Sequence, residues 1–470
     1  MKVTAKNIFT VLAFLFMFGY ASYSNIIAKA TNGLSRYILL VGILFFVVLA
    51  NSSRKFTLKL PSSVPPYMLL WFLMGLFALA GIVRVRFGSL QIVICILFAF
   101  VAGTNDDWIE TAVKIAKFLL FVFVFFTFFF LLFPKTYKVV THFYGFIPDG
   151  TARGAFPYRA GIASHYSINA LNISLLLIFV AVKYILDNGI TLKFKKGSTF
   201  DLVLMGMTFF ALLMTAKRGV LVWSILAVGI FYILLNKGNV GNIIKVIIIA
   251  LILLGILILL SENIAVLSKV FERFRVVGTS EDNSAAQRLA MWKLALRYFK
   301  KSPIFGTGFW TYRGFYNTNL SAIYDKNGQH GSIDAHNVYI QVLCETGIIG
   351  LTIYLLAIGF LLYRTITLLW TLDRNESRLQ GIISLSLALQ IFYILYSFSG
   401  NCFYDMTFFY YSFSMALTYA AENRIRKNRM QYSRQSEEVQ QNVREVYYDE
   451  EEVVETVRET YNENSNVNLS

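Results

Sequence analysis

Charged residues and cysteines are both scarce in this chain. Of its 470 residues, 15% are charged and 56% are hydrophobic, and the mean hydropathy is +0.57. So little charge excludes a soluble domain of this length, because a soluble surface needs more polar side chains. The three cysteines, Cys95, Cys344 and Cys402, all lie in or beside apolar runs. This placement excludes a disulfide framework and a metal cluster held by cysteine.

Clustered carboxylates are missing too. The chain contains no Asp-x-Asp, and the adjacent Asp106 and Asp107 fit helix capping better than metal binding. Divalent cations such as Mg²⁺ and Ca²⁺ prefer carboxylate oxygens. We therefore expect no bound metal and no cofactor.

Long apolar runs recur along almost the whole chain. Each is long enough to cross the roughly 30 Å hydrocarbon core of a bilayer as a helix, which satisfies its own backbone. We expect an all-α polytopic membrane protein with about twelve transmembrane helices. The expected spans are residues 8–26, 36–51, 67–83, 89–103, 116–133, 165–183, 200–215, 219–236, 243–261, 338–363, 379–400 and 403–420. Around residue 217 the sequence fits either two helices joined by a short hairpin or one long bent helix.

Lysine and arginine in the short loops predict the orientation. The loops that contain Lys55, Lys195 and Arg374, together with both ends of the chain, fall on one side of the predicted spans. By the positive-inside rule that side is the cytoplasm. Both termini are then cytoplasmic, and we interpret the signal-like N-terminus as an uncleaved first helix.

Four regions follow from this arrangement. Residues 1–260 hold nine spans, residues 261–336 form one long extracytoplasmic loop that contains helices, and residues 337–420 hold three spans. Residues 421–470 form an acidic tail. From Gln431 to Ser470 it has ten acidic and three basic residues and few large aliphatic ones. Such a composition predicts a disordered cytoplasmic segment.

Several cations break the charge rule because they fall on the predicted outer face or near membrane depth. They are Arg84, Arg86, Arg153, Arg159, Lys217, Arg218 and Arg288. The run "TAKRGVLVW" leaves Lys217 and Arg218 almost no loop, so at least one of them lies near the bilayer, where a cation marks a functional site. Snorkelling to lipid headgroups or pairing with carboxylates is the alternative. We expect these cations to bind an anionic ligand. The expected partners of this basic chain, whose net charge is +16, include membrane lipid and no nucleic acid.

The long outer loop contains a predicted helix and ends at a histidine. "NSAAQRLAMWKLALRYFKK" has a capping box, Ser284 with Gln287, and puts Arg288 and Trp292 on one face. The alternative is an amphipathic helix lying on the outer leaflet. "SIDAHNVYIQVLCETGIIG" then places His336 and Asn337 where a membrane helix begins. Helix N-terminal amides disfavour imidazolium, so His336 is a candidate general base, or else a capping residue.

Taken together, "QRLAMWKLAL", "SPIFGTG" and "AHNVYIQVLCETGIIG" resemble the signature of the O-antigen ligase and O-antigen polymerase superfamily of bacterial membrane glycosyltransferases. The similarity covers roughly residues 285–350, and "KRG" at 217–219 resembles a basic motif of the same family. In the stretch 152–171, "YRAGIASH" stands where many members have a Pro-Asn pair.

The resemblance implies a function at the outer face of the bacterial cytoplasmic membrane. Its members move a glycan from undecaprenyl diphosphate to an acceptor hydroxyl. Arg218 and Arg288 would then bind the diphosphate and His336 would take the acceptor proton. The substrate-binding candidates are Lys217, Arg153, Arg159, Trp292 and Asn337. The expected partners are the lipid-linked oligosaccharide, membrane lipid, a flippase and a chain-length regulator.

Four functions remain open at the level of the sequence. A polymerase joins lipid-linked repeat units, whereas a ligase moves the finished glycan to another acceptor. We favour the polymerase, because this lysine- and isoleucine-rich chain resembles polymerases of capsule-type clusters. A polysaccharide transporter or flippase would show internal two-fold repetition, which the chain does not display. A scaffold for envelope assembly would leave Arg218, Arg288 and His336 individually dispensable.

Overall fold

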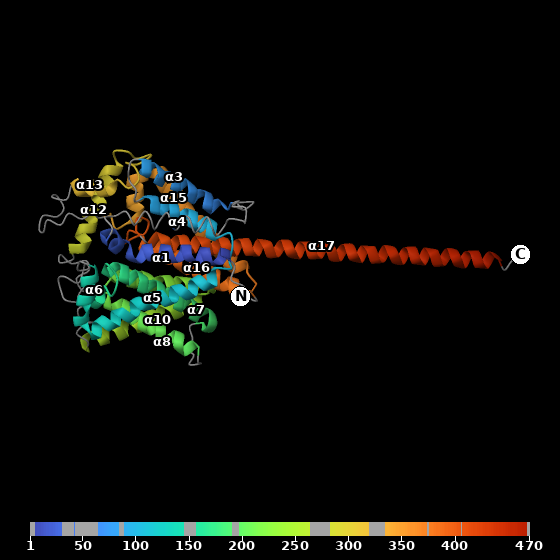
Figure 1. The fold of residues 1–470 in the computed structure, drawn as a ribbon, viewed down its shortest axis with the longest axis horizontal. Helices are drawn as coiled ribbons and strands as arrows, with labels where there is room; N and C mark the ends of the chain where they lie inside the picture. Colours follow the sequence, from blue (N-terminus) through green and yellow to red (C-terminus); the bar gives the residue numbers. More distant parts are fainter. Residues whose placement is uncertain are drawn as a thin grey trace. The chain divides into compact units, whose positions relative to one another are not determined.

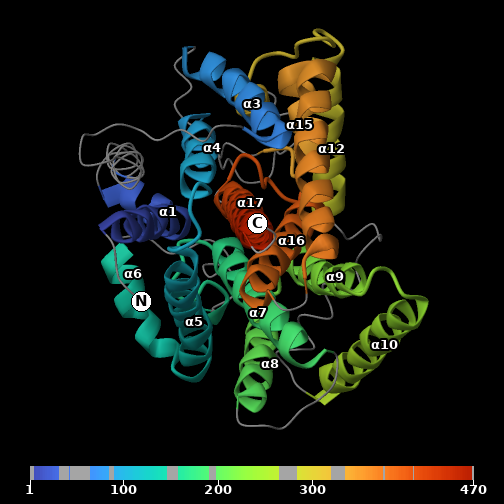
Figure 2. The same cartoon turned by 90° about the vertical axis from the view of Figure 1, so that its right-hand side faces the viewer.

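In the computed structural model the described part of the chain is built from helices. It describes residues 5–30, 42, 64–83, 89–144, 157–189, 197–263, 283–318, 334–373, 376–405 and 407–467, and none of them forms a strand. The elements labelled in Figures 1 and 2, with the short helices between them, are α1 (Ala5–Ala30), α3 (Pro66–Val83), α4 (Leu90–Ala102), α5 (Ile109–Leu132), η2 (Pro134–Thr136), α6 (Tyr137–Tyr144), η3 (Pro157–Arg159), α7 (Tyr166–Asn188), α8 (Ser198–Met214), α9 (Arg218–Leu235), α10 (Val240–Asn263), α12 (Asn283–Phe299), α13 (Tyr312–Thr318), α15 (Val338–Thr371), α16 (Ser377–Tyr396) and α17 (Thr407–Val467).

Many of these helices are apolar enough for a bilayer. In the part of the chain that the structure describes, five have both the length and the composition to cross a membrane, namely α5, α7, α9, α15 and α16. Shorter apolar helices lie within α1, α3, α4, α8 and α10. Large apolar side chains stay exposed on α3, α10 and α15, including Leu76, Leu251 and Phe360. Exposed leucines and phenylalanines on helices fit a surface covered by lipid, so the chain is a multi-pass membrane protein.

The observed helices follow the predicted spans closely. The spans expected at 8–26, 67–83, 89–103 and 116–133 correspond to α1, α3, α4 and α5, and the later ones correspond to α7–α10 and α15–α17. The span at 36–51 lies outside the described residues, so the count of twelve stays a prediction. Around residue 217 the structure has two separate helices, α8 and α9, and not one long bent helix. The chain breaks between α8 and α9, and Ala216 has a φ of 53°.

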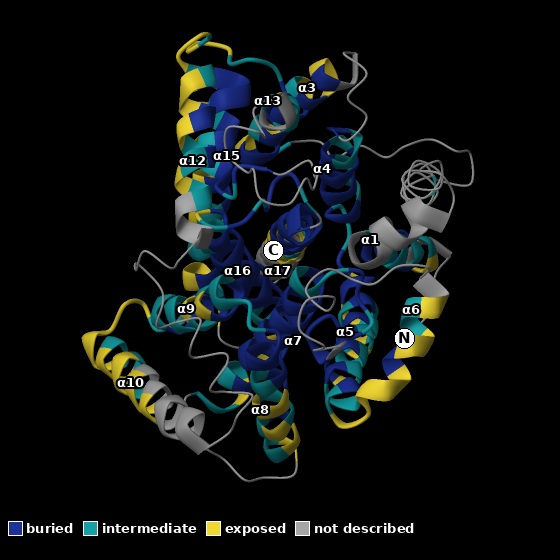
Figure 3. Ribbon diagram, turned by 90° about the vertical axis from the view of Figure 1, so that its left-hand side faces the viewer, coloured by how far each residue is buried: buried dark blue, intermediate teal, exposed yellow. Residues whose placement is uncertain are grey.

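Two helices occupy the interior of the helical bundle. α7 and α16 are largely buried, as Figure 3 shows, and they pack on each other and on α9. α15 packs against α3 on one flank and against α12 on another, so that these three helices lie side by side in Figure 2. Buried polar side chains join α15 and α16, because Gln390 Nε2 donates to Thr365 Oγ1 at 2.8 Å. Such interhelical bonds hold membrane helices together where lipid supplies no hydrophobic drive.

The C-terminal segment differs from the prediction of disorder. The chain divides into two compact units, Met1–Ala421 and Glu422–Ser470. The second unit is the continuation of α17, which is helical to Val467. From Thr407 to Val467 the chain has no glycine and no proline. Its Glu, Gln and Arg residues are strong helix formers, so the backbone preference wins over the polar composition that predicted disorder.

Candidate functional site

His336 lies in the described segment 334–337 that leads into α15, directly before Asn337. Its backbone adopts a left-handed conformation with a φ of 52°, which a residue with a side chain rarely takes. Asn337 caps α15, since its Oδ1 accepts a hydrogen bond from Ile340 N at 3.1 Å. The next amide, Val338 N, donates to Ser397 O at 2.9 Å. The segment is therefore bonded from both sides, and the cap at Asn337 leaves the His336 side chain outside the helix.

α12 carries Trp292 and Arg288 to this segment. Trp292 Nε1 donates to Ala335 O at 2.9 Å. The apolar face of α12 is buried with Tyr312, Ala335 and Cys344, so it packs against protein, whereas the alternative of a helix lying on the outer leaflet required that face to meet lipid. The helix runs from Asn283 to Phe299, starting one residue before the predicted cap.

A second group of cations gathers where α8 ends and α7 begins. Arg159 is buried, and its Nε donates to the carbonyl oxygen of Thr215, two residues before Lys217, at 3.1 Å. The Arg159 guanidinium carbon lies 4.8 Å from the centre of the Tyr166 ring, and the Lys217 ammonium lies 5.2 Å from it. Tyr166 follows His165, whose Nδ1 accepts a bond from Ser167 N and caps α7. One aromatic ring thus holds two cations near a histidine.

Electrostatic interactions connect the two groups. Burial lowers the pKa of His336 to about 4, and the charges of Lys217 and Arg288 lower it as well, while Asp334 opposes them. Burial also lowers the pKa of Lys217; Tyr166 raises it, and Arg288 lowers it further. Lys217 and Arg288 therefore both lie within electrostatic range of His336. The imidazole is neutral at pH 7, a form that can accept a proton.

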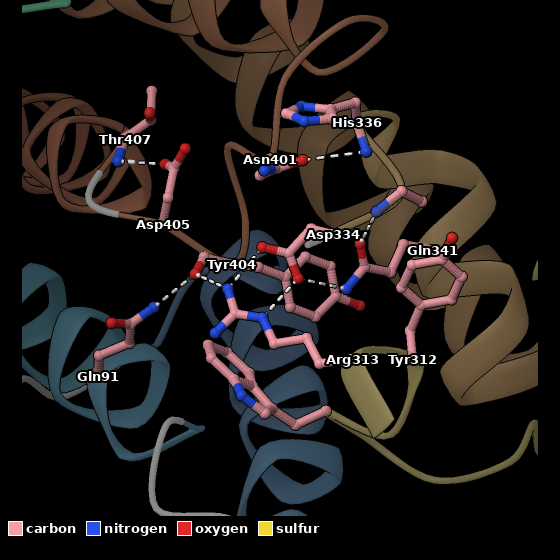
Figure 4. A network of polar contacts seen from close by, with 12 residues as sticks. Gln91, Tyr312, Arg313, Asp334, His336, Gln341, Asn401, Tyr404, Asp405 and Thr407 are labelled. Atoms are coloured by element: carbon pink, nitrogen blue, oxygen red, sulfur yellow. Dashed lines mark hydrogen bonds and ion pairs between the residues drawn. The ribbon is translucent and has the colours of Figure 1, made fainter. Parts of the chain in front are cut away.

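An ion pair that the sequence did not predict supports the His336 segment (Figure 4). Arg313 Nε and Nη2 donate to Asp334 Oδ1 and Oδ2 at 2.6 and 2.5 Å, a bidentate geometry. Gln341 Nε2 donates to Asp334 Oδ1, and Gln341 Oε1 accepts from Ala335 N. The pair joins the two chain ends that flank residues 319–333. Only the contacts between distant residues identify it, because an arginine and an aspartate 21 positions apart form no motif.

The segment 397–405 between α16 and α17 also contacts this site, although the sequence alone did not predict it. Asn401 Oδ1 accepts a bond from His336 N at 3.0 Å, and Phe398 O accepts one from Asn337 Nδ2 at 3.4 Å. Ser399 Oγ accepts from Trp223 Nε1 of α9 at 2.7 Å. Polar residues in "SFSGNCFYD" between two apolar spans were the available signal. The segment contacts both α9 and the His336 loop.

Glu345 and Gly347 join the turn 303–312 to α15. Glu345 is fully buried, and its carboxylate accepts bonds from Trp310 N at 2.8 Å and Tyr312 N at 2.9 Å. At Gly347 the helix breaks, with a φ of 69°. A Cβ on Gly347 would lie 2.2 Å from Ile304 O, so this glycine permits a close approach of the turn. In the sequence, "SPIFGTG" and the Glu345–Gly347 triplet are two separate motifs. In the structure they pack together as one unit.

Backbone strain is concentrated in this region. Among the described residues that are not glycine, four have a positive φ, and they are Ala216, Lys237, Trp310 and His336. Ala216 precedes Lys217, Trp310 donates its amide to Glu345, and His336 is itself a candidate. Strained residues of this kind cluster at functional sites.

The remaining candidates have separate positions. Arg218 is the first residue of α9 and is half-buried. Arg153 lies outside the described residues. Within the described ranges, no group of three His, Cys, Asp or Glu side chains is placed to hold a metal ion. The three cysteines are free and buried.

Residues 202–355 match the family described as O-antigen ligase, which confirms the resemblance inferred from the motifs. The matched range contains Lys217, Arg218, Arg288, Trp292 and His336. Arg159 and the segment 397–405 lie outside it. No curated protein matches the chain.

Proposed function

We propose that this chain, whose residues 202–355 match the O-antigen ligase family, is a glycosyltransferase of cell-surface polysaccharide assembly. Its donor is an oligosaccharide linked to undecaprenyl diphosphate, and its acceptor is a hydroxyl group. It acts at the outer face of the bacterial cytoplasmic membrane, with both termini in the cytoplasm. A flippase supplies the donor at that face, and a chain-length regulator acts on the product.

One observation carries the proposal. A half-buried histidine with a pKa of about 4 shares its surroundings with Lys217 and Arg288, and both cations act on that pKa. A neutral imidazole can take a proton, and two cations can hold a diphosphate. Transfer of a glycan from a diphosphate to a hydroxyl needs these two functions together.

The chemistry is a single displacement. His336 takes the proton of the acceptor hydroxyl while the hydroxyl oxygen attacks the anomeric carbon. The bond between that carbon and the diphosphate oxygen breaks, and undecaprenyl diphosphate leaves with the electron pair. Arg288, Lys217 and Arg218 stabilise the charge that develops on the leaving oxygens, as fixed cations do in a site of low dielectric. In-line attack inverts the anomeric configuration.

The first candidate is a polymerase, whose acceptor is a second lipid-linked repeat unit. The second candidate is a ligase, which the description of the matched family favours. A ligase moves the finished glycan to a different acceptor. The site chemistry is the same in both, and the acceptor distinguishes them.

The test is transfer by the purified full chain in lipid vesicles. The donor is the undecaprenyl-diphosphate oligosaccharide fraction extracted from the native cells, and EDTA is present throughout. The variants are His336→Ala and Arg288→Ala. Their controls are His142→Ala, an exposed histidine, and Arg297→Ala, an exposed arginine on α12. Arg297 is nine residues after Arg288, so it faces the other side of the helix.

A ladder of lengthening lipid-linked glycans supports the polymerase. We expect His336→Ala and Arg288→Ala each to lower the rate by more than about 100-fold, and the two controls to keep the wild-type rate. Transfer that begins only when a second acceptor is added identifies a ligase. Unchanged products in both site variants would disprove the roles of His336 and Arg288, and loss of transfer in EDTA would disprove metal independence.

A further inference from the structure

The left-handed backbone at His336 needs support from its surroundings. A residue with a Cβ is disfavoured in this conformation, because the Cβ comes too close to the following carbonyl oxygen. The neighbouring amides are held by Gln341 Oε1, which accepts from Ala335 N, and by Ser397 O, which accepts from Val338 N. At His336 itself the amide donates to the side chain of Asn401, 3.0 Å away. This bond comes from a residue 65 positions further along the chain.

We propose that Asn401 is a positioning residue, which holds the His336 backbone in the conformation that presents the imidazole to the acceptor. The proposal rests on the proposed function in naming His336 as the base. Asn401 lies outside residues 202–355. The positioning therefore comes from a part of the chain that the family match does not cover.

Asn401 is itself held by its own turn. Its carbonyl oxygen accepts bonds from Tyr404 N at 2.7 Å and Asp405 N at 3.0 Å. Tyr404 O in turn accepts from Gln91 Nε2 of α4 at 3.1 Å and from Arg313 Nη2 at 3.4 Å. Figure 4 shows these groups around one point, with Asn401 between Tyr404 and His336. A side chain anchored in this way can hold the amide of another segment.

The same segment contacts α9. Ser399 Oγ, two residues before Asn401, accepts from Trp223 Nε1 and lies 3.2 Å from a Cβ built on Gly219. α9 begins at Arg218, directly after Lys217. Segment 397–405 thus binds the base on one side and the helix that carries the cations on the other. It fixes the position of His336 relative to Lys217 and Arg218.

The group that accepts the hydrogen bond of the His336 amide is the uncharged side chain of Asn401. Replacing it with a charged acceptor should therefore change the pKa of the His336 imidazole. The groups that already act on His336 are Lys217 before α9, Arg288 of α12, Asp334 of its own segment and His165 before α7. An aspartate at position 401 would keep an oxygen for the amide and add a negative charge beside the imidazole. That charge favours imidazolium, so it raises the pKa of His336.

The experiment compares Asn401→Ala and Asn401→Asp with Asn188→Ala and Asn188→Asp in the full chain in vesicles. Asn188 is a matched control because its Oδ1 accepts from Ser198 Oγ, and it ends α7 at the opposite end from His165. Two quantities are measured. One is kcat and the apparent KM for the extracted lipid-linked donor. The other is the pH dependence of His336 modification by diethyl pyrocarbonate, which reacts with neutral imidazole and is located by mass spectrometry.

We expect Asn401→Ala to lower kcat by about 10- to 100-fold, because a displaced base loses its alignment. The KM should stay within about twofold, since Asn401 bonds to a backbone amide and not to the donor. Asn401→Asp should recover most of the rate at high pH. Its His336 modification should fall off at a higher pH than in the wild type. The Asn188 variants should change neither quantity.

Two results would overturn the inference. One is a kcat for Asn401→Ala equal to that for Asn188→Ala, and the other is a His336 titration that Asn401→Asp leaves unmoved. The modification readout needs no transfer. If the wild type transfers no glycan yet Asn401→Asp shifts the titration, the proposed function fails while the contact between Asn401 and His336 stands.

Discussion

His336 combines a strained backbone with a neutral side chain. The sequence suggested the neutral form from the helix N-terminus, whereas the structure attributes the lowered pKa first to burial and then to Lys217 and Arg288. The difference matters for catalysis. A base that burial and neighbouring cations together keep neutral is also near the groups that would bind the diphosphate.

The pH profile of the rate tests this environment. Because the pKa of His336 is about 4, the acid limb of kcat/KM should lie near pH 4, well below the value of about 6.5 for a free imidazole. The base must be deprotonated, so activity falls as the pH drops through this pKa. Lys217→Met removes a positive charge and should move the acid limb upward.

The control is Lys237→Met, an exposed lysine that follows α9. It should leave the acid limb where the wild type has it. If the acid limb of the wild type lies at about pH 6.5, the pKa of a free imidazole, then burial and the neighbouring cations do not lower the pKa of His336.

At the scale of elements, the break in α15 organises the part of the site around Glu345 and the turn 303–312. Thr307 N donates to Cys344 O at 3.0 Å and Ile348 N donates to Pro303 O at 2.9 Å, so the turn replaces the hydrogen bonds that the helix lacks there. Glu345 then holds the amides of Trp310 and Tyr312. The turn leads into α13, which carries Arg313 to Asp334. A kink in one membrane helix thereby determines where the His336 segment is anchored.

Gly347→Ala should destabilise the protein strongly. Its φ of 69° disfavours a side chain, and its Cβ would clash with the backbone of Ile304. We expect a loss of more than about 2 kcal/mol in the free energy of unfolding. Thermal unfolding in detergent measures the effect as a lower Tm.

Gly359→Ala is the control on the same helix, because nothing lies within 4 Å of its Cβ position. It should leave the Tm unchanged or raise it slightly, since alanine favours helix. Equal Tm values for the two variants would mean that the turn does not dock into the break.

For the whole molecule, the open question is which side of the membrane each part faces. Loop charges predict that residues 261–336 lie outside and both termini inside. All three native cysteines are buried, so single introduced cysteines can report accessibility without background.

We expect Lys301→Cys to react with a membrane-impermeant maleimide in intact cells, because Lys301 is exposed after α12. Lys427→Cys is exposed on α17 and should react only after the membrane is opened. Labelling of both in intact cells, or of Lys427→Cys alone, would reject the predicted orientation.

The sequence by itself determined the class of the fold, the limits of most apolar helices and the resemblance to the O-antigen ligase family that residues 202–355 confirm. Each of these depends on local properties, namely the length of an apolar run and the order of short motifs. It also identified Lys217, Arg288 and His336 as candidates. For the C-terminal segment the polar composition predicted disorder, whereas the structure has one helix from Thr407 to Val467, which is rich in helix-forming residues.

Only the tertiary structure brought Lys217 and Arg288 within electrostatic range of His336. It also revealed the ion pair of Arg313 with Asp334 and the bond from His336 to Asn401. These contacts join residues far apart in the chain, and their formation depends on how α9, α12, α15 and the segment 397–405 pack. A sequence lists the side chains that can donate and accept, but packing selects which of them meet.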